Sequence, residues 1–220
     1  QSNLEKQTAY YLNALRLYEK IKNKSGAAMV YSNLSVMYYD LGQTEKAIAY
    51  AKQSISIREQ LQDIRGLSYA YCNLSQMYLK TDLTEAAKYA ALCTKVAELL
   101  KDDGRLIHAI NTTGLVKGSE GDKNEVLTSA LQVLEILKKK TNFSIDISRQ
   151  YLSIGIIMSE ARMDSAMALY YFNKGLDMAL EIGDKGSIRD AYLNKTIFFK
   201  IRNDFYNAYE NIKKYHSYKD

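Results

Sequence analysis

A motif that returns after 40 residues is the feature that most constrains how this chain can fold. It consists of a tyrosine, a leucine three positions later, a serine and a second tyrosine, and its clearest copies occupy residues 31–38 and 71–78. One small residue marks each copy at a spacing of 39 to 41 residues: Ser35, Ser75, Gly114, Gly155 and Thr196. A fixed period of this length is typical of stacked repeat proteins, whose units cannot bury their apolar faces alone.

The residues around each motif follow the periodicity of a helix. In the first copy, one face carries the apolar and small side chains at a spacing of three or four residues: Ala27, Val30, Tyr31, Leu34, Ser35, Tyr38 and Leu41. The chain has no proline, which would interrupt helices. Candidate N-caps are Thr44, Thr84, Ser144 and Ser187. We therefore predict an all-α fold of about eleven antiparallel helices.

The period divides the chain into a half unit followed by five units. We expect a half repeat at 4–25 and repeats at about 26–65, 66–104, 105–145, 146–186 and 187–220, together forming a single domain over 4–220. Residues 1–3, with the sequence Gln-Ser-Asn, have the character of a remnant left by tag cleavage. We exclude them from the fold and expect the chain to be a piece of a longer protein.

The motif resembles the tetratricopeptide repeat, a helix-turn-helix unit of about 34 residues. The resemblance rests on aromatic-x2-Leu-small-x2-Tyr, followed nine residues later by Ala47 and Ala87. The units here are about six residues longer than that repeat and lack its closing proline, as in the branch similar to kinesin light chains and bacterial peptide-responsive regulators. The resemblance implies a right-handed α-α superhelix with a concave groove. The tail from Ala208 onward also resembles the last repeat of sensor portions in bacterial regulators.

The resemblance places the groove on the helix face opposite the motif. Candidate ligand-binding residues on that face are Asn33, Val36, Tyr69, Asn73, Gln76, Lys80, His108, Thr112, Arg149, Ser153 and Asn194. An asparagine amide offers both a donor and an acceptor, as an extended peptide backbone requires. The alternative is that these amides bond to the neighbouring repeat and hold the stack in register. Lys80, His108 and Arg149 are candidate anchors for a carboxylate, against the commoner reading of scattered surface charge.

Other chemistry finds little support in the composition. The 30 basic and 25 acidic residues leave a net charge of +5, and the one dense basic run, Lys138–Lys140, falls at an expected helix end. Neither His108 nor His216 belongs to a metal spacing, so we predict no metal, no cofactor, no catalytic residues and no enzymatic activity. We also predict no direct nucleic-acid binding and no membrane insertion. Cys72 and Cys93 are predicted to be buried free thiols.

The functional prediction is a solenoid that binds a protein or peptide, as the sensing or interaction portion of a larger bacterial regulatory protein. The alternative is a structural or oligomerisation scaffold without a peptide ligand, and a homodimer is left open. The compartment is either the bacterial cytoplasm or the periplasm, the latter if the chain precedes a membrane helix.

Overall fold

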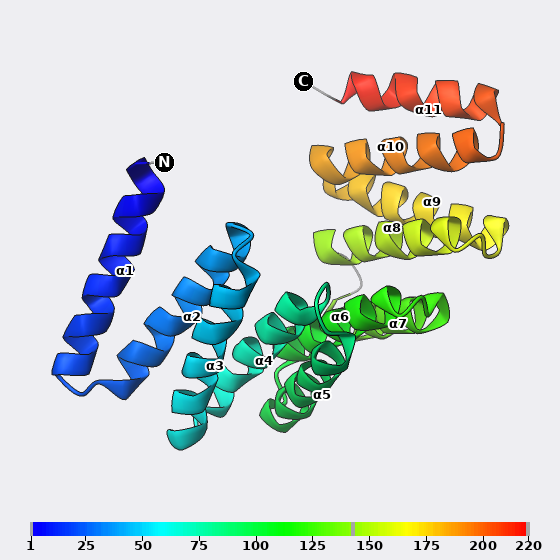
Figure 1. Ribbon diagram of the computed structural model, residues 1–220. Helices are drawn as coiled ribbons and strands as arrows, with labels where there is room; N and C mark the ends of the chain where they lie inside the picture. The colour runs from blue at the N-terminus through cyan, green and yellow to red at the C-terminus, as the bar shows by residue number, and fades with distance from the viewer. Residues whose placement is uncertain (1, 142–143, 219–220) are drawn as a thin grey trace. The chain divides into compact units, whose positions relative to one another are not determined.

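The computed structural model describes residues 2–141 and 144–218, which contain helices and no β-strand. The helices follow one another along the chain (Figure 1) and confirm the predicted all-α class. In the described residues there are eleven: α1 (Ser2–Lys20), α2 (Lys24–Asp40), α3 (Thr44–Gln60), α4 (Ile64–Tyr78), α5 (Leu83–Leu100), α6 (Asp103–Ser119), α7 (Lys123–Lys140), α8 (Ile145–Glu160), α9 (Ser165–Ile182), α10 (Lys185–Ile201) and α11 (Phe205–Ser217).

Most helices begin at an aspartate whose carboxylate accepts hydrogen bonds from backbone N–H groups of the first turn. These caps are Asp63, Asp82, Asp102, Asp122, Asp164, Asp184 and Asp204. The predicted cap Ser144 is confirmed, since its side chain accepts from the backbone nitrogen of Ile147. Thr84 and Ser187 are wrong as caps, because an aspartate two or three residues earlier takes that role. Thr44 is also wrong, because α3 starts there after Gln43.

The chain divides into two compact units, Gln1–Gly121 and Asp122–Asp220. In the first, which contains α1–α6, α4 packs between α3 and α5 and also contacts α2 and α6. In the second, which contains α7–α11, α8 packs between α7 and α9 and also contacts α10. Each unit thus has the nearest-neighbour packing of stacked helical hairpins. The single domain over 4–220 stays a prediction.

The small residue of the motif permits helices to cross closely. A Cβ added to Gly155 of α8 would lie 2.7 Å from the Cδ1 atom of Phe172 in α9, whose side chain is 1% exposed. At the same motif position in the first unit, the fully buried Ser75 donates a hydrogen bond of 2.7 Å to the carbonyl of Ala86. The period therefore marks close contacts between the two helices of a hairpin.

The motif tyrosines form a repeated cluster. Tyr71 and Tyr78 of α4 both stack on Tyr89 of α5, with ring centroids 6.1 and 5.9 Å apart. The hydroxyl of Tyr71 donates a 2.8 Å hydrogen bond to Glu59 at the end of α3. The same arrangement occurs one unit earlier, in Tyr31, Tyr38, Tyr50 and Glu19. The tyrosines thus join each helix both to its hairpin partner and to the preceding helix.

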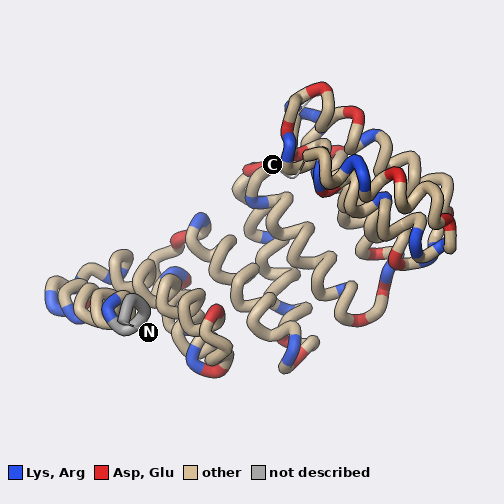
Figure 2. The backbone as a smooth tube through the Cα atoms, turned by 90° about the horizontal axis from the view of Figure 1, so that it is seen from above, with Lys and Arg blue, Asp and Glu red and all other residues tan. Residues whose placement is uncertain are grey.

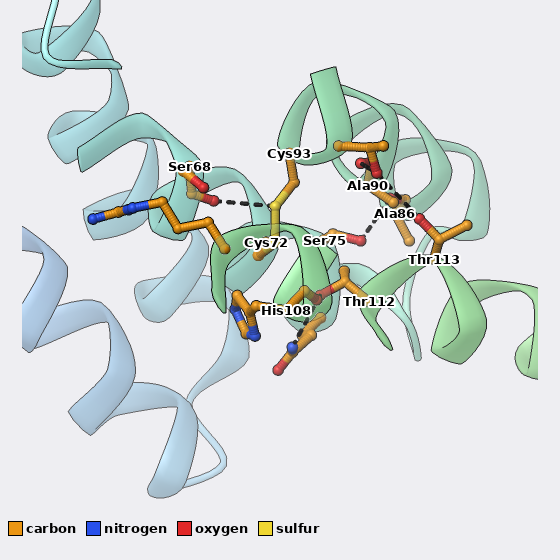
Figure 3. Close-up of a disulfide and its surroundings, with 12 residues drawn as sticks. Ser68, Cys72, Ser75, Ala86, Ala90, Cys93, His108, Thr112 and Thr113 are labelled. Carbon is orange, nitrogen blue, oxygen red and sulfur yellow. Dashed lines mark hydrogen bonds between the residues drawn. A yellow bond between two sulfur atoms is a disulfide. The ribbon is translucent and has the colours of Figure 1, made fainter. Parts of the chain in front are cut away.

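The prediction of free thiols is wrong. Cys72 of α4 and Cys93 of α5 form a disulfide with a Cα–Cα distance of 5.3 Å (Figure 3). Both side chains are 0% exposed. The two cysteines are 21 positions apart, and the antiparallel hairpin places them opposite each other. The spacing matches no metal-binding motif, and by itself it does not predict a disulfide. Predicting the pair requires the register of the two helices, which decides which residues face each other.

Candidate functional site

The predicted ligand-binding residues divide between the two units. Eight belong to the first unit, on α2, α4 and α6 or, for Lys80, just after α4. They are Asn33, Val36, Tyr69, Asn73, Gln76, Lys80, His108 and Thr112. The other three belong to α8 and α10 of the second unit: Arg149, Ser153 and Asn194. Each set therefore belongs to its own unit.

On α2 and α4 the predicted face is open to solvent. Val36 is 40% exposed and Tyr69 is 50% exposed, whereas Leu34 and Leu74 on the opposite faces of the same helices are 0% exposed. Asn33 is exposed and Asn73 is half-buried. We call these four residues, Asn33, Val36, Tyr69 and Asn73, the inner face of the first unit.

The side-chain amides of the two inner-face asparagines are unbonded within the described parts of the chain. In the residues that the structure describes, no hydrogen bond involves the side-chain amide of Asn33 or Asn73. Asparagine is a poor helix former, so its presence in the middle of a helix needs some other explanation. The missing bonds weigh against the alternative in which these amides hold neighbouring repeats in register.

Further along, on α6, the predicted residues take part in packing. Thr112 is 1% exposed, and its hydroxyl donates to the carbonyl of His108 at 2.9 Å. The same hydroxyl accepts a long 3.5 Å hydrogen bond from Nε2 of Gln76 on α4. The structure therefore places Thr112 between α4 and α6, away from the surface, and Gln76 beside it. Helices α4 and α6 thus lie close enough for their side chains to contact each other.

Tyr69 is held by Arg105, which is not among the candidate residues predicted from the sequence. The guanidinium carbon of Arg105 lies 4.5 Å from the ring centroid of Tyr69, and its Nη1 donates a 2.7 Å hydrogen bond to the carbonyl of Arg65. The hydrogen bond to the carbonyl holds the guanidinium in place, and the cation–π contact in turn holds the ring of Tyr69. Arg105 precedes His108 by three positions on the same helix face, which is the one sequence signal that could have found it.

His108 does not offer a positive charge to a ligand. Its ring lies 5.7 Å from that of Tyr69, and burial lowers the pKa of its imidazole, which is therefore neutral at pH 7. Its Nε2 atom is buried and has no hydrogen-bond partner in the described part of the chain. Lys80 is exposed, so among the predicted carboxylate anchors of this unit only the lysine presents a charge at the surface.

A pocket opens at the α1 end of the inner face. It has a volume of about 290 Å³ and is lined by Gln7, Tyr11, Asn33, Val36, Met37, Asp40 and Leu41. Two of these, Asn33 and Val36, were predicted from the sequence. Gln7 and Tyr11 were not, because they come from α1, and only the packing of α1 against α2 brings them to this face.

In the second unit the three predicted residues lie on the neighbouring helices α8 and α10. Arg149 is exposed, and its guanidinium lies 3.8 Å from the carboxylate of Asp184, the cap of α10. Ser153 and Asn194 are half-buried. The arginine is thus partly neutralised by a residue of its own unit, and a carboxylate ligand would have to compete with that aspartate.

Comparison with known proteins agrees with the repeat fold described above. Residues 2–60 match the family model of the tetratricopeptide repeat. The chain has the tetratricopeptide-repeat fold. No curated protein sequence matches it.

Solved structures show the same tetratricopeptide-repeat fold at low identity. BtubC (BKLC) from P. vanneervenii is 15% identical with a TM-score of 0.82, covering 98% of this chain and 91% of that one. A STAND signal-transduction ATPase from Pyrococcus horikoshii with a tetratricopeptide repeat sensor is 19% identical with a TM-score of 0.73; the match covers 93% of this chain but only 31% of that protein. YrrB, described as having an unusual peptide-binding site, is 16% identical with a TM-score of 0.55, and the match covers 93% and 91%.

Charge is mixed across both units of the chain. Figure 2 shows basic and acidic residues interspersed along the helices of each unit. None of the helices in residues 2–141 and 144–218 combines the length and apolarity that crossing a bilayer requires.

The inner face offers amides that are unbonded in the described residues, beside exposed apolar and aromatic side chains. Such a surface can exchange hydrogen bonds with a main chain and bury side chains, and it contains no nucleophile–base pair.

Proposed function

We propose that the inner face of the first unit binds a peptide or an extended protein segment, and that binding rather than catalysis is the function of the chain. The single observation that carries this proposal is that the amides of Asn33 and Asn73, next to the exposed Val36 and Tyr69, make no hydrogen bond in the part of the chain that the structure describes. An extended peptide has alternating N–H and C=O groups, which two such amides can satisfy as donor and acceptor.

The apolar residues of the face supply the rest of the binding energy. Tyr69 is half exposed but already fixed by Arg105, so a ligand that packs on its ring loses little side-chain freedom. The helix that carries Tyr69 and Asn73 is also joined covalently to α5 through Cys72 (Figure 3). A rigid platform of this kind lowers the entropic cost of binding.

The similar structures support the same class of function. YrrB is described as a tetratricopeptide-repeat protein with a peptide-binding site, and the STAND protein carries its tetratricopeptide repeats as a sensor. On this basis we further propose that the chain acts as the sensing or interaction portion of a larger bacterial regulatory protein.

The test is a selection of random twelve-residue peptides displayed on phage against the immobilised chain. The affinity of the best peptide is then measured by fluorescence anisotropy for the chain, for Asn33→Ala/Asn73→Ala and for the control Asn13→Ala/Asn124→Ala, which changes two exposed asparagines elsewhere. Losing two hydrogen bonds of about 1 kcal/mol each should weaken binding about tenfold or more in the first variant alone. Equal affinities for all three proteins would contradict the proposal.

A second candidate function is a self-associating scaffold, which one observation favours. Tyr10 and Leu17 of α1 and the following Ile21 lie on one helix face and are 73%, 63% and 66% exposed. A second copy of the chain could cover this face. Sedimentation velocity distinguishes the candidates: a dimer that Leu17→Glu dissociates supports the scaffold, and a monomer at tens of micromolar excludes it.

A further inference from the structure

The pocket between α1 and α2 adjoins the proposed peptide-binding face and has a distinct composition. Asn33 and Val36 belong to both, so a peptide on the inner face passes the mouth of the pocket. The wall is held in place by the contact between α1 and α2, in which the hydroxyl of Thr8 lies 3.6 Å from the sulfur of Met37. The volume of about 290 Å³ is at the lower limit of ligand pockets, about 300 Å³, and suits one side chain rather than a whole ligand.

The pocket holds one charged residue among those that line it, Asp40. Its carboxylate is exposed and makes no ion pair or hydrogen bond in the residues that the structure describes. The other lining residues are uncharged. The unpaired negative charge therefore has no structural counterpart, although the chain as a whole carries a net charge of +5.

The position of Asp40 at the end of its helix means that helix stability does not account for its charge. Asp40 is the last residue of α2, where unbonded carbonyl groups already place partial negative charge. A carboxylate at that end is unfavourable for the helix, and it strengthens the local negative potential at the pocket. Helix stability therefore does not explain the residue, whereas attraction of a cation does.

The remaining walls fit the stem and head of a basic side chain. Met37 and Leu41 offer apolar contact to a methylene chain, and Tyr11 adds an aromatic ring that can also contact a cation. The amide oxygens of Gln7 and Asn33 can accept hydrogen bonds from a planar guanidinium while the carboxylate binds it through two oxygens. An ammonium group can use fewer of these acceptors at once.

We propose that this pocket binds a basic side chain of the peptide held on the inner face, arginine in preference to lysine. The proposal rests on the proposed function, because the peptide main chain must cross Asn33 for its side chain to enter. It identifies the ligand class as a peptide with an arginine beside the segment that contacts Asn33.

The test uses four acetylated and amidated pentapeptides, Ala-Ala-X-Ala-Ala, in which X is arginine, lysine, citrulline or glutamate. Citrulline has the shape of arginine without its charge. Each peptide is titrated into the full nitrogen-15-labelled chain, and amide resonances are followed by NMR. The arginine peptide should shift the amides of Tyr11, Val36 and Leu41 and bind about fivefold more tightly than the citrulline peptide, as for a partly exposed ion pair. Lysine should fall between them and glutamate should bind most weakly.

Two variants connect the preference to the carboxylate. Asp40→Asn should reduce arginine binding to the citrulline level, whereas Glu160→Gln, the same change of charge at the last residue of α8, should leave the preference unchanged. An arginine preference that survives Asp40→Asn overturns the pocket assignment. If all four peptides shift the amide resonances of Asn33 and Asn73 equally, whatever the central residue, the pocket proposal is also overturned, but the proposed function is left intact. If no pentapeptide shifts any resonance, the pocket proposal fails, and the phage selection decides the proposed function separately.

Discussion

At the scale of single residues, Tyr71 shows how a motif side chain joins two helices. Its side chain is 7% exposed, yet its hydroxyl reaches Glu59 at 2.8 Å. Burial, followed by the hydrogen bond and the charge of Glu59, raises the pKa of the Tyr71 phenol. The phenol is therefore a hydrogen-bond donor throughout the range in which unfolded tyrosines keep their protons, below about pH 10.

Replacing Tyr71 with phenylalanine should lower the free energy of unfolding by about 1 kcal/mol at pH 8, the value of one hydrogen bond. The pH dependence has a defined sign. Because the folded pKa is raised, the contribution is complete below the unfolded value of about 10 and is lost as pH rises further. The difference between the chain and Tyr71→Phe should therefore shrink above pH 10, measured by urea unfolding. Tyr209→Phe, at a side chain that is 63% exposed, is the control and should change little.

The disulfide gives a second prediction at this scale. Cys72 and Cys93 are separated by 21 positions, and closing a loop of that size stabilises a fold by about 2–4 kcal/mol. Adding reductant should lower the guanidinium chloride concentration at which half of the chain is unfolded, but it should not change this midpoint for Cys72→Ser/Cys93→Ser. Finding two reactive thiols per chain in denatured, unreduced protein would disprove the pairing.

At the scale of helices, the 40-residue motif specifies contacts within hairpins. The period locates the small residue of each copy, and Gly155 shows why it is needed, since the ring of Phe172 occupies the space where a Cβ would lie. The leucine positions mark the buried face, since Leu34 and Leu74 are 0% exposed. The tyrosine positions mark it less sharply, because Tyr71 is buried but Tyr31 is half-buried. Both depend on residues close in sequence, which periodicity captures.

Gly155→Ala tests this close contact. In an open helix the change would stabilise by about 1 kcal/mol through helix propensity. Here the new Cβ would lie 2.7 Å from a fully buried ring, so we expect a net loss of about 1–3 kcal/mol. Gly186→Ala in α10 is the matched control, because its nearest contact is an ordinary 3.7 Å. Thermal unfolding of both variants measures the difference, and a more stable Gly155→Ala would refute the crossing.

Contacts between helices could be predicted less well from the sequence than the face that each helix buries. Thr112 has the register of a surface residue, and its burial follows from how closely α6 approaches α4. The pairing of Cys72 with Cys93 depends on which residues of α4 and α5 face each other. The pocket around Asp40 needs side chains of α1, whose motif is incomplete. Periodicity predicts which face of each helix is buried, but the distances between packed helices follow only from the packing itself.

At the scale of the whole molecule, the chain consists of two compact units with repeated hairpins, and the first contains most of the predicted binding residues. In repeat proteins each hairpin is stabilised by its neighbours, so surface residues of the inner face can change without loss of the stack. We propose that Asn33 and Asn73 belong to such a surface and do not hold the repeats together.

Equilibrium urea unfolding of Asn33→Ala/Asn73→Ala tests that claim most directly. Because neither amide is bonded in the described residues and alanine is the better helix former by up to about 0.7 kcal/mol per site, the double variant should be as stable as the parent chain or slightly more stable. A loss of more than about 1 kcal/mol would mean that the amides make structural hydrogen bonds, and would contradict the assignment of this face to a ligand.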